Sequence, residues 1–254
     1  MSNNNYIISN YRDGIRTITI KRPERKNALC TSMYQTITRI LTEDASNDRV
    51  VVTIITGYGS YFSSGNDIKA AMFGEISMNE GLNSFKELVN TLINYPKLLI
   101  AVVNGPAVGI GATMAALCDI VYAADTAVFD TPFVKLGLCA EAASSYTFPQ
   151  ILGRSKASEV ILLNHKLNAQ EAHQFGLVSR VIPQSALDEF IVELRRYGKL
   201  PVQNLIRNKR LIMSNFKRIL CECNEREIDE LIVCAQSEEF VNAVTTFMHK
   251  KSKL

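Results

Sequence analysis

The chain has 254 residues, of which 47% are hydrophobic and 21% are charged, the composition of an ordinary globular protein. Its formal net charge of +3 at pH 7 is too small to indicate a nucleic-acid partner. No apolar run approaches the roughly 20 residues that a membrane-spanning helix requires, so we expect no membrane span. The six cysteines are irregularly spaced in a chain without a secretory signal, which favours reduced thiols over a disulfide framework.

The first half of the chain alternates predicted strands and helices. Residues 16–21 alternate apolar and polar side chains, as in a half-buried strand. Residues 31–46 place apolar side chains at helical spacing behind a Thr-Ser start. Residues 50–56 (VVVTIIT) are continuously apolar and β-branched, which is typical of a strand covered on both faces.

The same alternation continues, and the final part is predicted to be helical. Further elements are helices at 68–73 and 81–95, a strand at 98–104, a helix starting at 108–111, and strands at 119–125 and 127–131. From Ser144 onwards the pattern is helical almost to the end. We therefore predict an α/β core followed by a helical part, within one domain.

Two segments share one form: a buried strand, a tight glycine turn and the start of a helix. The turns are residues 63–67 (SSGND) and 105–111 (GPAVGIG). A helix N-terminus presents unsatisfied N–H groups, and glycine lets a ligand approach the backbone. Two such turns side by side would form an oxyanion hole. On pattern alone, ordinary strand-to-helix turns are the alternative, and neither turn carries a P-loop or a full dinucleotide fingerprint.

At these turns and beyond, the sequence resembles the crotonase (enoyl-CoA hydratase/isomerase) superfamily. The motifs are RPERKNAL (22–29), FSSGND (62–67), AVVNGPAVGIGATMAALCDIVYAA (101–124), FDTPFVKLGL (129–138) and LNAQEAHQFGLVSRVI (167–182). Several linked motifs in the family's order are far more specific than any one of them.

The resemblance implies an α/β fold with a spiral core of ββα turns and a helical C-terminal trimerisation region. A single domain over 1–254 would then divide into a core at about 1–200 and helices at about 201–249. The expected assembly is a homotrimer or hexamer, and no nucleic acid is expected as a partner. We expect no metal and no cofactor, because coenzyme A is part of the substrate in this family.

The resemblance also implies an acyl-CoA thioester whose carbonyl oxygen lies between the backbone N–H groups of Asn66 and Ile110. The family's contacts to coenzyme A map to residues 26–29 and 63–68, with Lys26 and Lys69 as weak candidates for the phosphates. The implied substrate-binding set is Lys26, Ala28, Ser63, Ser64, Gly65, Asn66, Asp67, Ile68 and Gly109.

Hydratases of this family use two glutamates, and this chain has Thr113 and Phe133 at those positions, so the hydratase reaction is disfavoured. Glu141 remains, alone among small and apolar residues in LCAEAASSYTFP. Such surroundings would raise its proton affinity toward that of a useful base, although an exposed loop acid fits the composition equally well.

The stretches AVVNGPAVGI and AEAASSYTFP resemble the peroxisomal Δ3,Δ2-enoyl-CoA isomerase branch, in which one glutamate at this position moves a proton from C2 to C4. We therefore predict isomerisation of fatty enoyl-CoA thioesters in unsaturated fatty acid β-oxidation, with Glu141 as sole acid–base. Other acyl-CoA reactions remain open, such as thioester hydrolysis or dienoyl-CoA isomerisation using Asp130 or Glu159. A non-catalytic acyl-CoA-binding protein is a third hypothesis.

Six large side chains could belong either to the core or to a tunnel for the acyl chain, and the core is the expectation for each. They are Tyr61, Phe62, Met72, Phe73, Phe129 and Phe133.

The last three residues, Ser252, Lys253 and Leu254, form the Ser-Lys-Leu peroxisomal address. Lys250 and Lys251 precede it on a tail that we expect to be exposed. This predicts recognition by a peroxisomal import receptor and location in the peroxisomal matrix.

Overall fold

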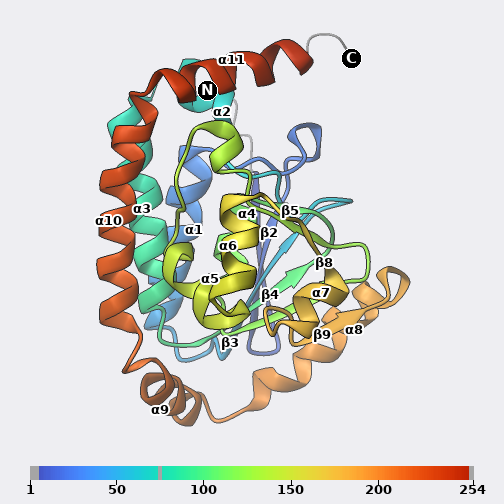
Figure 1. Cartoon of the computed structure of the whole chain (residues 1–254). Helices are drawn as coiled ribbons and strands as arrows, with labels where there is room; N and C mark the ends of the chain where they lie inside the picture. Colours follow the sequence, from blue (N-terminus) through green and yellow to red (C-terminus); the bar gives the residue numbers. More distant parts are fainter. Residues whose placement is uncertain (1–5, 74–75, 252–254) are drawn as a thin grey trace.

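The computed structural model describes residues 6–73 and 76–251, and its main feature is a six-stranded sheet (Figure 1). Its strand order is β1-β2-β3-β4-β6-β9, in which β1 and β2 are antiparallel and the other neighbours are parallel. The strands are β1 Ile7–Arg12, β2 Ile15–Ile20, β3 Val52–Gly57, β4 Leu98–Val103, β6 Ile120–Ala124 and β9 Arg180–Ile182. A second, three-stranded sheet consists of β5 Ala107–Val108, β7 Val128–Asp130 and β8 Leu167–Asn168.

The central strands are buried on both faces, as their continuous apolar runs predict. Adjacent residues of β3 enter different cores: Ile54 packs into one cluster and Ile55 into the other. Val102 and Val103 of β4 divide in the same way, because successive strand side chains point to opposite faces. Helices are therefore required on both sides of the sheet.

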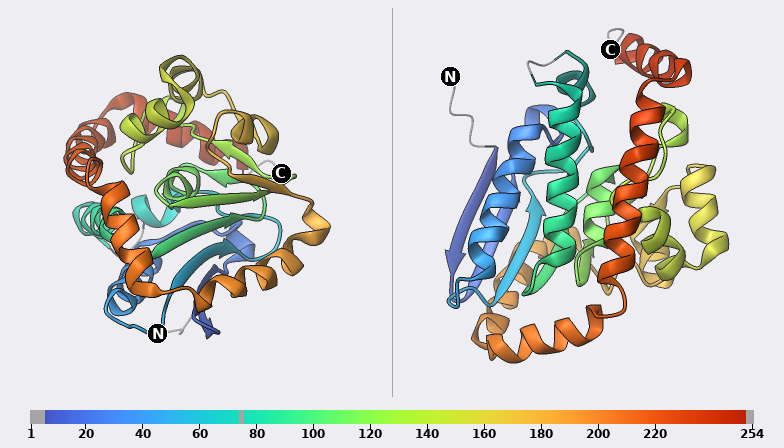
Figure 2. Two further views of the ribbon diagram at one scale, coloured as in Figure 1. Left: turned by 90° about the horizontal axis from the view of Figure 1, so that it is seen from below. Right: turned by 90° about the vertical axis from the view of Figure 1, so that its left-hand side faces the viewer.

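Three long helices lie side by side along one face of the molecule (Figure 2, right). They are α1 Thr31–Ala45, α3 Met78–Asn94 and α10 Lys217–Ala235. The helix α8 Leu187–Glu193 and the turn η4 Leu194–Lys199 contribute Leu187, Phe190 and Leu194 to the other core. This arrangement confirms the α/β core with a helical final part.

The remaining helices connect and close these layers. They are α2 Ile68–Phe73, α4 Ile110–Ala116, α5 Ser144–Leu152, α6 Arg154–Leu162, α7 Ala169–Gln174, α9 Val202–Met213 and α11 Glu238–Lys251, with short 3-10 turns η1 Pro23–Arg25, η2 Val134–Leu136 and η3 Gln184–Ala186. The last helix, α11, crosses the end of the molecule above α3 and α10 (Figure 1). None of the helices within 6–73 and 76–251 is long and apolar enough to cross a membrane.

The expectation of continuous helix after Ser144 is wrong in two places, where β8 and β9 form. Both strands have two or three residues, too few to show an alternating pattern. β9 pairs in parallel with β6 and completes the main sheet, so a long-range contact and not local sequence makes it a strand.

Candidate functional site

The two glycine turns lie against each other at the ends of β3 and β4. Ser63 and Ala107 form a parallel bridge, and the Val108 N–H donates to the Ser63 carbonyl at 2.9 Å. Gly65 has a φ of +90°, and a Cβ there would lie 2.9 Å from the Val108 carbonyl oxygen. The close approach of the two turns therefore requires glycine at this position.

The Asn66 backbone is held in an extended conformation against Leu29. The Leu29 N–H donates to the Gly65 carbonyl and the Asp67 N–H donates to the Leu29 carbonyl, both at 2.8 Å. Successive N–H groups of an extended segment point to opposite sides, so the Asn66 N–H faces away from Leu29. The second predicted donor, Ile110, is the first residue of α4, where N–H groups have no partner within the helix.

Glu141 lies where these turns converge, and its side chain is buried, with the residue 3% exposed. Its Oε1 lies 3.5 Å from the position that a Cβ on Gly109 would take. Its carboxylate accepts hydrogen bonds from the Ile110 N–H and, at Oε2, from Asn66 Nδ2 at 3.2 Å. The sequence left open whether Glu141 is exposed or desolvated, and the structure buries it.

Burial raises the pKa of Glu141 to about 8, and the negative charge of Glu227 adds to this rise. The hydrogen bonds from Asn66 and Ile110 act in the opposite direction, because they stabilise the carboxylate. A carboxyl group with this proton affinity can both remove a proton near neutral pH and hold it for return.

A hydrogen-bonded chain connects α1 to Glu141 through the Asn66 side chain. The Tyr34 hydroxyl donates to Asn66 Oδ1, and this contact turns Asn66 Nδ2 toward Glu141. Burial raises the pKa of Tyr34 well above its usual value, so the hydroxyl stays a neutral donor. Tyr34 was not singled out in the sequence, where it is one residue of the predicted helix at 31–46.

A cavity of about 420 Å³ opens beside Glu141. Its lining is mostly apolar and comes from α1, α2, α3, α10, α11 and the first glycine turn. The lining residues are Arg22, Leu29, Cys30, Thr31, Ser32, Tyr34, Asn66, Asp67, Ile68, Ala70, Ile76, Ser77, Met78, Gly81, Leu82, Phe85, Leu138, Glu141, Leu231, Ala235 and Phe240. An apolar cleft with few polar groups suits an elongated apolar ligand that is anchored at one polar point.

The two segments predicted to contact coenzyme A run side by side. The Ser64 N–H donates to the Lys26 carbonyl at 2.9 Å, and Ser63 Oγ donates to the Asn27 carbonyl at 2.9 Å. Asn66, Asp67 and Ile68 reach the cavity. The other members of the predicted set, Lys26, Ala28, Ser63, Ser64, Gly65 and Gly109, lie behind or beside it, and Lys69 is exposed on α2.

Arg22 joins these two segments and was not singled out in the sequence. Its Nη1 donates to Asp67 Oδ2 at 2.7 Å and to the Ala28 carbonyl at 3.1 Å. The guanidinium and an Ala70 backbone hydrogen bond hold the pKa of Asp67 below its usual value against the effect of burial. Asp67 is therefore a fixed carboxylate within an ion pair, in contrast to Glu141.

The positions at which hydratases of the resembled family carry glutamates are filled by side chains that do not ionise near neutral pH. Thr113 is fully buried on α4 with its hydroxyl 3.4 Å from the Gly109 carbonyl, and Phe133 is 3% exposed. Asp130 is engaged by Lys166 and Asn164, and Glu159 is engaged by Lys156 on the surface. Neither acid lines the cavity beside Glu141.

The remaining sequence candidates divide between core and surface. Phe62, Phe129 and Phe133 are buried core residues, as expected, and Tyr61 is half-buried. The side chains of Met72 and Phe73, and residues Ser252, Lys253 and Leu254, lie outside those that the structure describes. Within 6–73 and 76–251, no group of three or more His, Cys, Asp and Glu side chains is arranged to hold a metal ion.

The chain belongs to the enoyl-CoA hydratase/isomerase family, whose sequence profile matches residues 10–253. It is similar to enoyl-CoA delta isomerase 2 of Rattus norvegicus, with 46% identity over 95% of this chain and 63% of the rat protein. It is also 41% identical to enoyl-CoA delta isomerase 3, peroxisomal, of Mus musculus, over 97% of this chain and 79% of the mouse protein. The chain thus spans less than two thirds of the rat protein.

The fold is also shared with solved structures. The crystal structure of an enoyl-CoA hydratase/isomerase from Pseudoalteromonas atlantica T6c matches with a TM-score of 0.90 and 29% identity, over 96% of this chain and 97% of that one. Pseudomonas aeruginosa OdaA matches with a TM-score of 0.89 and 32% identity. The predicted crotonase-type fold is therefore confirmed.

Proposed function

We propose that this chain is a Δ3,Δ2-enoyl-CoA isomerase that moves the 3-cis or 3-trans double bond of a fatty acyl-CoA to the 2-trans position. The observation that carries this proposal is the buried carboxyl group of Glu141 at the meeting point of two glycine turns and an apolar cavity. The rat and mouse relatives named enoyl-CoA delta isomerases support it.

The reaction requires one base and one site for negative charge. The thioester carbonyl oxygen would accept the N–H groups of Asn66 and Ile110, which stabilises an enolate. Glu141 would remove a proton from C2, hold it as a carboxylic acid and deliver it to C4 as the double bond moves to C2–C3. The atoms balance without water, metal or redox cofactor.

The Ile110 N–H also stabilises the Glu141 carboxylate. Binding of the thioester would therefore replace the carboxylate at this donor by a neutral carbonyl oxygen, which becomes anionic only in the enolate. The carboxylate would lose a stabilising hydrogen bond at the same moment, which increases its tendency to take up the C2 proton. Asn66 Nδ2 would remain as its partner.

The fatty acyl chain would occupy the apolar cavity between α1, α3 and α10, and coenzyme A would lie along residues 26–29 and 63–68. Lys26 supplies positive charge on this side of the cavity, whereas the charge of Arg22 is paired with that of Asp67. Hydration of a double bond is not proposed, because Thr113 and Phe133 provide no second acid–base group.

The test is an assay that follows formation of the conjugated 2-trans thioester from 3-enoyl-CoA, with wild type and Glu141→Gln. The amide keeps the shape of the side chain, so we expect acyl-CoA binding to persist while kcat falls by about 10²- to 10⁴-fold. Equal activity in both proteins would assign the base to another residue. Binding without turnover in the wild type would favour the hypothesis that the chain binds acyl-CoA without catalysing a reaction.

We also propose a peroxisomal matrix location, supported by the sequence Ser252-Lys253-Leu254 and by the name of the mouse relative, enoyl-CoA delta isomerase 3, peroxisomal. A fluorescent protein fused to the N-terminus should accumulate in peroxisomes, and removal of Leu254 should leave it diffuse. Retention in peroxisomes after this deletion would rule out these residues as the address.

A trimer or hexamer is proposed for the assembly. Leu211 and Ile212 of α9 and Val233 of α10 are large apolar side chains with 69%, 66% and 65% exposure, and an assembly that covers them would bury apolar surface. Sedimentation of the purified chain should give a mass of three or six copies, and a monomer at micromolar concentration would contradict this assembly.

A further inference from the structure

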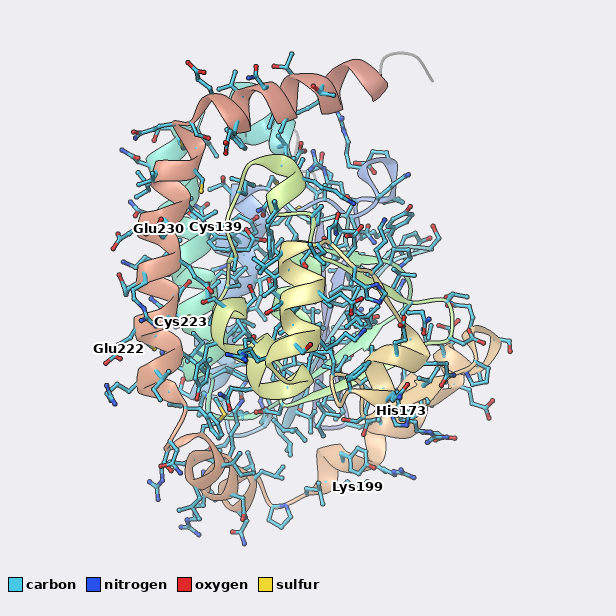
Figure 3. The ribbon with its side chains drawn as sticks, viewed as in Figure 1. Cys139, His173, Lys199, Glu222, Cys223 and Glu230 are labelled. Atoms are coloured by element: carbon cyan, nitrogen blue, oxygen red, sulfur yellow. The ribbon has the colours of Figure 1, made fainter. Side chains whose placement is uncertain are left out.

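Glu227 is a buried carboxylate on α10, far along the chain from the loop that it contacts. The residue is 6% exposed, whereas Glu222 and Glu230 on the same helix are exposed and point outward (Figure 3). Cys223, one turn before Glu227, lies on the inner side of α10. Residues four apart share a helix face, so Glu227 belongs to this inner side, and burial of an acid there requires hydrogen-bond donors.

These donors are the backbone of the segment that immediately follows Glu141. The Ala143 N–H donates to Glu227 Oε2 at 2.6 Å and the Ser145 N–H donates to Oε1 at 2.8 Å. The Cys223 thiol lies 3.6 Å from Oε1 and also contacts Ser145 Oγ at 3.1 Å. Ala143 and Ser145 form the N-terminus of α5, so an anion from α10 satisfies the free N–H groups of a second helix.

The segment that Glu227 holds has an unfavourable backbone. Ala142 and Ala143 are consecutive non-glycine residues with φ of +55° and +57°. Side chains of L-amino acids disfavour this left-handed region, so such a conformation persists only where neighbouring contacts fix it. Glu141 directly precedes this pair and accepts the Ser144 N–H at its carbonyl, at 3.2 Å. The direction of the Glu141 side chain therefore depends on the same contacts.

Glu227 also affects Glu141 through its charge. The charges and hydroxyl groups that act on Glu141 come from Glu227 on α10 and Tyr34 on α1, while the donors from the two glycine turns are uncharged. Three further titratable groups line the same cavity: Arg22, Cys30 and Asp67. The thiols of Cys139 and Cys223 lie next to Glu227. The negative charge of Glu227 raises the pKa of Glu141, in addition to the larger effect of burial.

We propose that Glu227 is a positioning residue, which holds the left-handed turn at Ala142–Ala143 so that the Glu141 carboxylate points between the two glycine turns. This inference rests on the proposed isomerase function. The C-terminal helices would thereby contribute directly to the catalytic geometry as well as to packing.

The test uses three variants of the full chain. Glu227→Gln keeps the shape but removes the charge and one acceptor; Glu227→Asp keeps the charge but shortens the reach; Glu230→Gln is the matched control on the exposed face. We expect kcat to fall by roughly 10- to 100-fold in both Glu227 variants, with KM within about threefold of wild type, because misplacement by about 1 Å can cost 10²-fold. Glu230→Gln should retain wild-type kcat.

The pH profile separates the two effects of Glu227. Glu141 acts as a base only when ionised, so kcat/KM should rise with pH through its pKa. Removal of the neighbouring negative charge lowers that pKa, so the rise should move to lower pH in Glu227→Gln and stay nearer its wild-type position in Glu227→Asp. Wild-type kcat in folded Glu227→Gln would overturn the proposal. A loss of kcat that is accompanied by weaker acyl-CoA binding and a lower Tm would also overturn the proposal, because it would indicate general destabilisation.

An inactive wild type would refute the isomerase function without deciding the role of Glu227. In that case the Glu141 carboxyl resonance, assigned by its loss in Glu141→Gln with 13C-labelled glutamate, is titrated in the apo proteins. We expect a lower midpoint in Glu227→Gln than in Glu230→Gln. Identical midpoints would overturn the inference independently of turnover.

Discussion

Glu141 experiences opposing influences on its proton affinity, and each comes from a different part of the chain. Burial and the charge of Glu227 favour the protonated acid, whereas the Asn66 amide and the Ile110 N–H favour the carboxylate. The balance leaves its pKa at about 8, between that of a permanent anion and that of a permanently neutral acid. A residue that takes and returns one proton needs this intermediate affinity.

Removal of the Asn66 side chain should weaken Glu141 as a base at neutral pH. Asn66→Ala keeps the backbone N–H but deletes the donor to Glu141 Oε2, so the pKa of Glu141 should rise further and the ascending limb of kcat/KM should move to higher pH. Tyr34→Phe removes only the contact that orients the amide, and should give a smaller shift in the same direction. A shift to lower pH in Asn66→Ala would show that this hydrogen bond does not stabilise the carboxylate.

The raised pKa of Glu141 also predicts a pH-dependent stability. The folded protein binds this proton more tightly than the unfolded chain, so the folded state is favoured at low pH and loses that advantage as pH rises from about 4.5 to about 8. Each unit of difference between the folded and unfolded pKa corresponds to roughly 1.4 kcal/mol of unfolding free energy. We expect Glu141→Gln to gain Tm relative to wild type between pH 6 and pH 9. A constant difference in Tm across this range would mean that Glu141 titrates normally.

At the residue scale, the sequence predicts groups that stand out locally and misses those defined by distant contacts. Glu141 is predictable because no other charged residue lies between Lys135 and Arg154. Tyr34 occupies an apolar position of a helix, and Glu227 lies in the charged run EREIDE, where an exposed acid is the natural expectation. Glu227 meets Ala143 across 84 residues, a separation that no local pattern reports.

At the element scale, segments with a strong apolar pattern are predicted well, whereas a strand at the edge of the sheet is not. The helix at 68–73 and the buried strands at 50–56 and 98–104 agree with α2, β3 and β4 within two residues at each end. β1 was missed because it is an edge strand whose residues after Ile8 are exposed, so it lacks the apolar alternation of a half-buried strand.

Helix α11 forms part of the cavity wall and contacts η2, and a substitution at Gly137 tests this contact. Gly137 has a φ of +66°, and a Cβ there would lie 2.6 Å from the Phe240 backbone nitrogen. Gly59 has a φ of +75° with no atom within 4 Å of such a Cβ, so Gly59→Ala measures backbone strain alone, roughly 1–2 kcal/mol. Gly137→Ala should cost more and should increase hydrogen exchange in α11. Equal losses of unfolding free energy in urea would contradict this packing.

At the scale of the whole molecule, a partly buried ion pair connects the C-terminal helices to the main sheet. Lys209 Nζ of α9 lies 2.7 Å from Asp119 Oδ2 and donates to the Lys97 carbonyl at 2.8 Å. Asp119 Oδ2 in turn accepts the Leu99 N–H at 2.8 Å, next to the start of β4. Burial lowers the pKa of Lys209 despite the attraction of Asp119.

Lys209→Ala should therefore destabilise the protein by about 1–3 kcal/mol, because it removes a buried ammonium group that donates to the Asp119 carboxylate and to the Lys97 carbonyl. The control is Arg218→Ala, which breaks an exposed pair with Glu222 and should cost less than about 1 kcal/mol. Urea unfolding of both variants measures the difference. A loss of unfolding free energy near zero for Lys209→Ala would mean that this contact does not couple the helices after residue 200 to the sheet.

The cavity beside Glu141 is closed by Leu231, Ala235 and Phe240, which belong to the last two helices. Its opposite wall, from α1 and α3, is complete before residue 95. During synthesis on the ribosome, the N-terminal wall therefore emerges long before the chain that covers it. Throughout this interval the cavity side of α1 and α3 lacks the cover of Leu231, Ala235 and Phe240. Translation of the final helices then supplies this cover and forms the binding site in the same step.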